Sequence, residues 1–143
     1  MNKKFAYFLL TILVTGYITG CSKKVEKSSV GESLVGTWRW VSTDGGFAFQ
    51  IHETPITTGR NIDLNISSDG KYSGYTNGTL TSNGTYVLET RKCIHDHTDK
   101  PFVNFSSDYD FMIEKIDMEN LEVSDEAYDG IGSAYKRKSL NGN

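Results

Sequence analysis

The sequence predicts an all-β fold, a small up-and-down antiparallel barrel of eight or nine strands built from residues 34–143. Short segments in this region alternate apolar with polar side chains, and a period of two is typical of half-buried strands. Tight-turn dipeptides lie between the segments, so consecutive strands should also pair in space. Closure into a barrel removes the exposed edges of such a sheet. A two-sheet sandwich is the main alternative, although it usually needs longer connections between its sheets.

The strands are expected in order along the chain. Apolar alternation begins with Trp38 and Trp40 and continues through residues 47–51 and 62–66. Dipeptides that tolerate the positive φ of two-residue hairpin turns occur at Asp44-Gly45-Gly46, Asp69-Gly70, Asn77-Gly78 and Asn83-Gly84. Later strands are expected at residues 85–90, 101–106, 109–116, 121–124 and 133–137. After residue 20, no segment keeps a helical period for more than about two turns.

The first 20 residues have the pattern of a secretory signal peptide. Lys3 and Lys4 precede an apolar run over residues 5–18, which is shorter than the roughly 20 residues that cross a bilayer as a helix. An uncleaved anchor is the open alternative. The Ile-Thr-Gly-Cys motif that ends at Cys21 resembles the cleavage site of a bacterial lipoprotein. That resemblance implies a lipid such as palmitate on the sulfur of Cys21, and therefore a membrane-anchored protein of the cell envelope.

Residues 21–33 are expected to form the lipidated cysteine and a flexible linker, because residues 22–32 are polar and lack aromatic side chains. The linker starts with basic residues, and by comparison with bacterial lipoproteins this favours the periplasmic side of the outer membrane. The whole chain has 15 Lys and Arg against 18 Asp and Glu. That balance argues against nucleic acid as a partner, and attraction to anionic headgroups explains the lysines beside Cys21.

Short motifs give the chain a resemblance to lipocalin-like domains. Gly36 and Trp38 match the family's Gly-x-Trp at the closed end of the barrel, and Ser-Asp-Tyr at residues 107–109 is similar to its Thr-Asp-Tyr turn. Arg137 lies where the family has an arginine stacked over the tryptophan. The resemblance implies that Gly36, Trp38 and Arg137 close the barrel, where a guanidinium over an indole contributes about 0.5–2 kcal/mol. A solvated Arg137 is the alternative.

The short lipocalin-like lipoproteins of bacterial envelopes are the most similar group. They share a Thr-Pro-x-x-Thr-Gly loop, which this chain has at residues 54–59. Most of these proteins have no assigned biochemical role.

Two functions remain open for such a domain. In the first, a small apolar or amphipathic ligand enters between the loops at residues 51–61 and 92–100. The residues expected to bind it are Trp40, Phe47, Phe49, Ile51 and Pro55. In the second, the barrel is filled and its exposed loops dock a protein, as an inhibitor or an assembly subunit does. An apolar cavity above about 300 Å³ favours the first function, and a filled interior favours the second.

A metal site is a further hypothesis. Cys93, His95 and His97 would lie on one face of an extended segment, with Asp99 as a possible fourth ligand, and these residue types suit a soft metal. The alternative is a polar loop with Cys93 packed against apolar neighbours. No nucleophile-elbow, zinc-helix or phosphate-binding glycine motif occurs in the sequence. We therefore expect neither an enzyme nor a bound cofactor.

Overall fold

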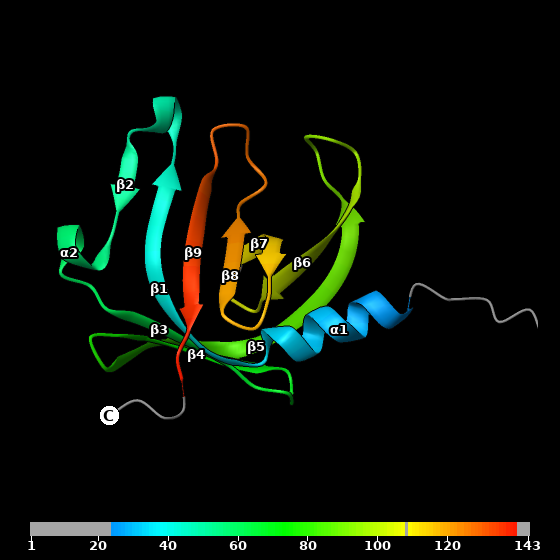
Figure 1. The fold of residues 1–143 in the computed structure, drawn as a ribbon, viewed down its shortest axis with the longest axis horizontal. Helices are drawn as coiled ribbons and strands as arrows, with labels where there is room; N and C mark the ends of the chain where they lie inside the picture. Colours follow the sequence, from blue (N-terminus) through cyan, green and yellow to red (C-terminus); the bar gives the residue numbers. More distant parts are fainter. Residues whose placement is uncertain (1–23, 108, 140–143) are drawn as a thin grey trace, which may run out of the picture.

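The computed structural model describes residues 24–107 and 109–139, which fold into a closed antiparallel β-barrel (Figure 1). The predicted fold class is confirmed. The spatial order of the strands is β2-β1-β3-β4-β5-β6-β7-β8-β9, and an additional pairing of β1 with β9 closes the ring. The strands are β1 Gly36–Gly45, β2 Ile51–Glu53, β3 Ile62–Ile66, β4 Lys71–Thr76, β5 Thr79–Lys92, β6 Asp99–Phe105, β7 Tyr109–Ile116, β8 Asn120–Ser124 and β9 Ile131–Arg137.

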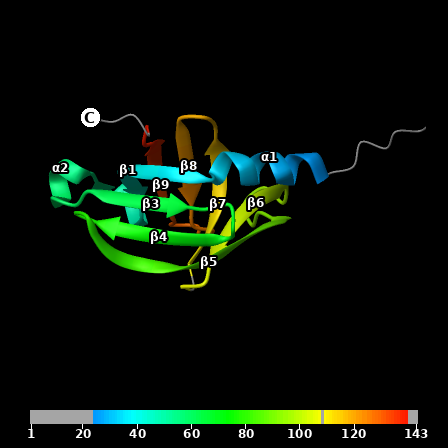
Figure 2. The ribbon, with the colours of Figure 1, turned by 90° about the horizontal axis from the view of Figure 1, so that it is seen from below.

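Eight strands form the barrel, and β2 lies outside it. The first half of β1 pairs with β3, and its last three residues pair with β2 on the same edge. On its other edge β1 pairs with β9, from Trp38 opposite Arg137 to Gly45 opposite Ile131. Within the described part of the chain, β2 therefore has only one neighbouring strand. Figure 2 shows β3, β4 and β5 side by side as the wall that faces away from α1.

The turn dipeptides have two different roles. Asp69-Gly70 lies between β3 and β4, and Asn77-Gly78 lies between β4 and β5, as predicted. The prediction of a turn at Asn83-Gly84 is wrong, because both residues lie inside β5. A Cβ atom on Gly84 would come 3.1 Å from Cε1 of Tyr72, and still closer to the Ser106 hydroxyl. This glycine allows close packing across the strand.

The predicted flexible linker is also wrong where the structure describes it, because residues Lys24–Leu34 form the helix α1. Val30 and Leu34 lie four residues apart and so share one face of this helix. Leu34 is fully buried in the barrel core, and Val30 packs against the same core. The helix is therefore part of the folded domain, and it lies along the end of the barrel at which β1 begins (Figure 1).

The core occupies the inside of the barrel. It contains Leu34, Trp38, Ile66, Val103, Ile113, Leu121 and Val123, with Leu64, Leu88, Phe105, Phe111 and Tyr135 among the side chains packed against it. Phe102 forms a second, smaller cluster with Cys93 and Met112. Because neighbouring residues of a strand point to opposite faces, Phe102 lies on the outer face when Val103 points inward. The guanidinium carbon of Arg91 lies 3.8 Å from the centre of the Phe102 ring and covers this outer cluster.

Candidate functional site at the open rim of the barrel

Arg137 closes one end of the barrel. Its guanidinium carbon lies 4.1 Å from the centre of the Trp38 ring. Its Nη1 donates to the carbonyl of Val35 at 2.8 Å, and its Nε donates to the carbonyl of Met118 at 2.8 Å. The buried indole of Trp38 donates to the carbonyl of Leu34 at 2.8 Å. The stacked pair that the sequence predicts is thus present, and Arg137 joins the start of β1 to the turn after β7.

Gly36 is necessary for that arrangement. A Cβ atom at this position would come closer than 3.0 Å to Nη1 of Arg137, and φ of Gly36 is +148°, a value that other residues rarely adopt. Gly36, Trp38 and Arg137 therefore act together as a structural seal, with no free polar atom directed at a ligand.

The interior of the barrel leaves little room for a ligand. Its apolar cavity has a volume of about 30 Å³ and is lined by side chains that include Leu34, Leu64, Phe111 and Tyr135. Sites for drug-sized molecules have volumes of about 300–1,000 Å³. In this structure the interior is filled with protein side chains.

The residues expected to bind a ligand do not come together inside the barrel. Trp40 points inward and is 3% exposed, and its indole donates to the Thr43 hydroxyl at 2.9 Å. Phe47 and Phe49 are 77% and 89% exposed, and Ile51 is 39% exposed. The expected inward-facing strand over residues 47–51 is wrong, because Phe47–Phe49 form a short 3₁₀ helix, η1, before β2.

These exposed residues belong to a segment that we call the β2 projection, residues 46–60. In Figure 1 it turns at the top of β1, runs down through β2 and ends beyond the short helix α2, Pro55–Thr58. Thr54 caps α2 by accepting from the backbone N–H of Thr57, and Pro55 begins it. Ile56, in the first turn of α2, is 94% exposed. The sequence analysis missed Ile56, although a threonine followed by proline is a signal for the start of a helix.

The backbone at the top of the projection is strained. Ala48 and Phe49 both have φ of +54°, in the left-handed region that disfavours residues with a side chain. Such a conformation costs of the order of 1–3 kcal/mol per residue and is most often found at functional positions. Here it holds two aromatic rings in solvent.

Ionic contacts fix the projection to the barrel. His52 Nδ1 forms a short hydrogen bond with Asp44 Oδ1 across the β1–β2 pair, and this bond is the main reason that the pKa of Asp44 lies below its usual value. At the other end, Arg60 Nη2 donates to Glu53 at 2.5 Å, and its guanidinium carbon lies 5.8 Å from the ring centre of Trp40. These exposed ion pairs contribute little energy singly, at most about 1 kcal/mol, but they define the direction of the segment.

The rim includes a loop that the sequence analysis did not assign to it. Residues 125–130, between β8 and β9, lie between the two predicted rim loops. The backbone N–H of Gly46 donates to the carbonyl of Gly130 at 3.1 Å, and that of Ile94 donates to Oε1 of Glu126 at 2.7 Å. The three connections are therefore joined to one another by hydrogen bonds.

The arrangement required for a metal site is absent. Residues 93–98 form a turn, in which the backbone N–H of His97 donates to the carbonyl of Cys93 at 3.0 Å. Cys93 is 2% exposed in the outer cluster, whereas His95 is exposed and contacts the Tyr128 ring at 5.2 Å. The described residues contain no group of three or more His, Cys, Asp or Glu side chains placed to hold a metal. The alternative prediction, a polar loop with Cys93 packed inside, describes this segment.

Cys21 and the rest of the predicted signal peptide lie outside the described residues. No helix in the described part of the chain is long and apolar enough to span a membrane. No family model, no curated protein and no solved structure matches this chain. The resemblance to lipocalin-like lipoproteins thus stays a prediction from the motifs themselves.

Proposed function

We propose that this chain is a lipid-anchored lipoprotein of the bacterial cell envelope whose filled, lipocalin-like barrel docks a protein through the β2 projection. The sequence around Cys21 supports the anchor and the compartment. The cavity of only about 30 Å³ supports docking in preference to a ligand held inside the barrel.

The exposure of Phe47 and Phe49 is the observation that carries this proposal. These rings and Ile56 expose between 77% and 94% of their surface. Burial of an apolar side chain of this size contributes about 1.5–3 kcal/mol, so the three together would contribute about 4–9 kcal/mol before the cost of association. Large aromatic side chains that enter a pocket of the partner are frequent centres of binding energy.

The shape of the projection indicates what kind of partner fits. The rings stand on a turn that protrudes beyond the end of β1, so the partner should present a concave apolar cleft. The turn also lies at the opposite end of β1 from α1 (Figure 1). A partner bound there would be on the side of the domain away from residue 24, and hence away from the proposed anchor.

Site-specific photocrosslinking in the cells that make the protein tests the docking role. A benzoylphenylalanine at position 49 should give one discrete protein adduct, because the ring would lie inside the partner's cleft. The control places the same residue at Tyr109, which is 66% exposed on β7. An adduct at position 49 that Phe47→Ser weakens supports docking. No adduct at position 49, or equal adducts at both positions, would contradict it.

The anchor has a separate test, because either half of the proposal could fail alone. Cys21→Ser should remove the lipid mass from the mature protein and release it from the membrane fraction. A variant that remains membrane-bound with an unmodified N-terminus would contradict lipidation and leave the docking result unaffected.

A further inference from the structure

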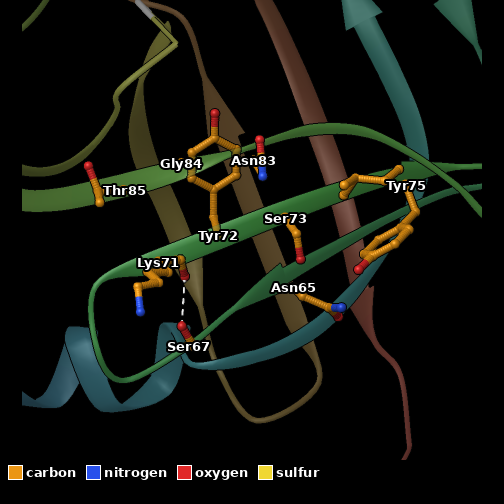
Figure 3. Close-up of a pocket in the computed structure, with 10 residues that line it drawn as sticks. Asn65, Ser67, Lys71, Tyr72, Ser73, Tyr75, Asn83, Gly84 and Thr85 are labelled. Carbon is orange, nitrogen blue, oxygen red and sulfur yellow. Dashed lines mark hydrogen bonds between the residues drawn. The ribbon is translucent and has the colours of Figure 1, made fainter.

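A second surface of the barrel has the geometry of a binding site. An open groove of about 530 Å³ lies over β3, β4 and β5 (Figure 3). The strand register arranges its side chains in rows across the sheet. Asn65, Ser73 and Asn83 form the middle row, Tyr75 and Leu80 lie on one side of it, and Lys71 and Thr85 lie on the other.

Alternation along the strands places these side chains on the outer face. Leu64 and Ile66 pack into the core, so Asn65 between them points away from it. The groove is consequently separate from the barrel interior. It is also formed by residues other than those of the β2 projection.

The groove is almost free of charge. No charged residue occurs between Lys71 and Glu89 in the sequence. Among the described residues that line the groove, Lys71 alone carries a charge, and Asp69 pairs with its ammonium group at 2.8 Å. Phosphate, carboxylate or sulfate ligands would meet no free cation here.

Several polar side chains of the groove are not used by the fold. Asn65 accepts a hydrogen bond from the Thr37 hydroxyl at 2.7 Å. In contrast, the side chains of Ser73, Tyr75 and Asn83 take part in no hydrogen bond with the residues that the structure describes. A hydroxyl and an amide each offer both donors and acceptors. These groups are free to bind a polar ligand that has no net charge.

We propose that this groove binds a neutral carbohydrate. The C–H faces of a sugar ring would pack on Tyr75 and the exposed Leu80, which is 51% exposed. The sugar hydroxyls would exchange hydrogen bonds with Ser73 and Asn83, which both donate and accept. A peptide strand is disfavoured, because β3, β4 and β5 already pair on both edges and leave no free edge for strand addition.

Titration of the ¹⁵N-labelled domain, residues 24–143, tests this proposal with maltohexaose, cellohexaose and N-acetylchitohexaose as neutral probes. At least one of them should shift the amide resonances of residues 65–85 in a saturable manner. The charged oligomers tetragalacturonate and a heparin hexasaccharide serve as ligand controls. Shifts with the charged oligomers alone, shifts confined to residues outside the groove, or no saturable shift with any neutral probe at 10 mM, roughly the weakest affinity that matters here, would each overturn the proposal.

Variants separate the groove from general effects on the fold. Tyr75→Ala should weaken binding about tenfold, and Asn83→Ala should weaken it as well. Tyr75→Phe keeps the ring and should retain most of the affinity. Tyr109→Ala, the matched control, removes an exposed tyrosine outside the groove and should leave the affinity unchanged. Equal losses in the control and in Tyr75→Ala would contradict a site in the groove.

Discussion

Substitution of Gly36 by alanine should destabilise the barrel through Arg137. The new Cβ atom would lie closer than 3.0 Å to Nη1 of Arg137, and the residue would keep a φ of +148°. Backbone strain of this kind costs about 1–3 kcal/mol, and displacement of the guanidinium from Trp38 loses about 0.5–2 kcal/mol. The expected loss is therefore about 2–5 kcal/mol, a large part of the 5–15 kcal/mol typical of a domain of this size.

Urea unfolding of residues 24–143 measures that loss as a lower midpoint with an unchanged slope. Gly78→Ala is the matched control, since its φ is +81° but a Cβ atom there has no neighbour within 4 Å. It should show the strain alone. The double variant Gly36→Ala with Arg137→Ala should lose less than the sum of the two single changes, because both remove the same contact. Additive losses, or a loss in Gly36→Ala no greater than in Gly78→Ala, would refute the reasoning.

Three further changes probe the core, the projection and the turn after β7. Trp38→Phe leaves the carbonyl of Leu34 without its donor and should lower the free energy of unfolding by about 2–4 kcal/mol; a loss below 1 kcal/mol would contradict the seal. Phe49→Ser should change that free energy by less than about 0.5 kcal/mol, because the ring is 89% exposed, and thermal unfolding would detect a packed ring as a larger loss. The backbone N–H of Glu119, followed by Asn120, lowers the pKa of Asp117 from 3.8 to about 2. The carboxylate therefore stabilises the folded state above pH 3.8, and this contribution is lost as the pH falls through 2. Acid unfolding of Asp117→Ala should lack that part of the pH dependence, and an unchanged acid profile would contradict it.

The barrel could be predicted because its signals are local and agree with one another. Alternation around Trp38 and the turn dipeptides at residues 69–70 and 77–78 each specify strands and hairpins, and consecutive hairpins restrict the topology to few solutions. The contact of Arg137 with Trp38 joins residues 99 positions apart, and the resemblance to lipocalin-like domains supplied it. The register of β1 and β9 gives the physical reason, since the two residues are directly opposite.

Other features depended on tertiary contacts that the sequence does not display. The helix α1 is polar over most of its length, and the burial of Leu34 under the barrel explains its place better than any helical period. Alternation over residues 47–51 is the same in a buried strand and in an exposed turn, so the period could not reveal that Phe47 and Phe49 face solvent. Asn83-Gly84 has the sequence of a turn, but its glycine provides space for Tyr72.

The groove could have been noticed in the sequence without being assigned. The stretch between Lys71 and Glu89 is rich in Ser, Thr, Asn, Tyr and Gly and contains no charge. Composition alone does not say which of these side chains share a face. The bulge between β4 and β5 at Gly74 and Tyr75 shifts the register by one residue, so only the structure brings Tyr75 opposite Leu80.

The filled interior of the barrel is the central claim, and a crystal structure of the protein purified from its own cells, with crystals also exposed to xenon under pressure, tests it most directly. The account predicts that side chains alone occupy the space around Leu64, Phe111 and Tyr135, and that xenon finds no site there, because an apolar cavity that admits it is nearer 150 Å³. Elongated apolar density along the barrel axis, or a xenon atom among these three residues, would contradict it.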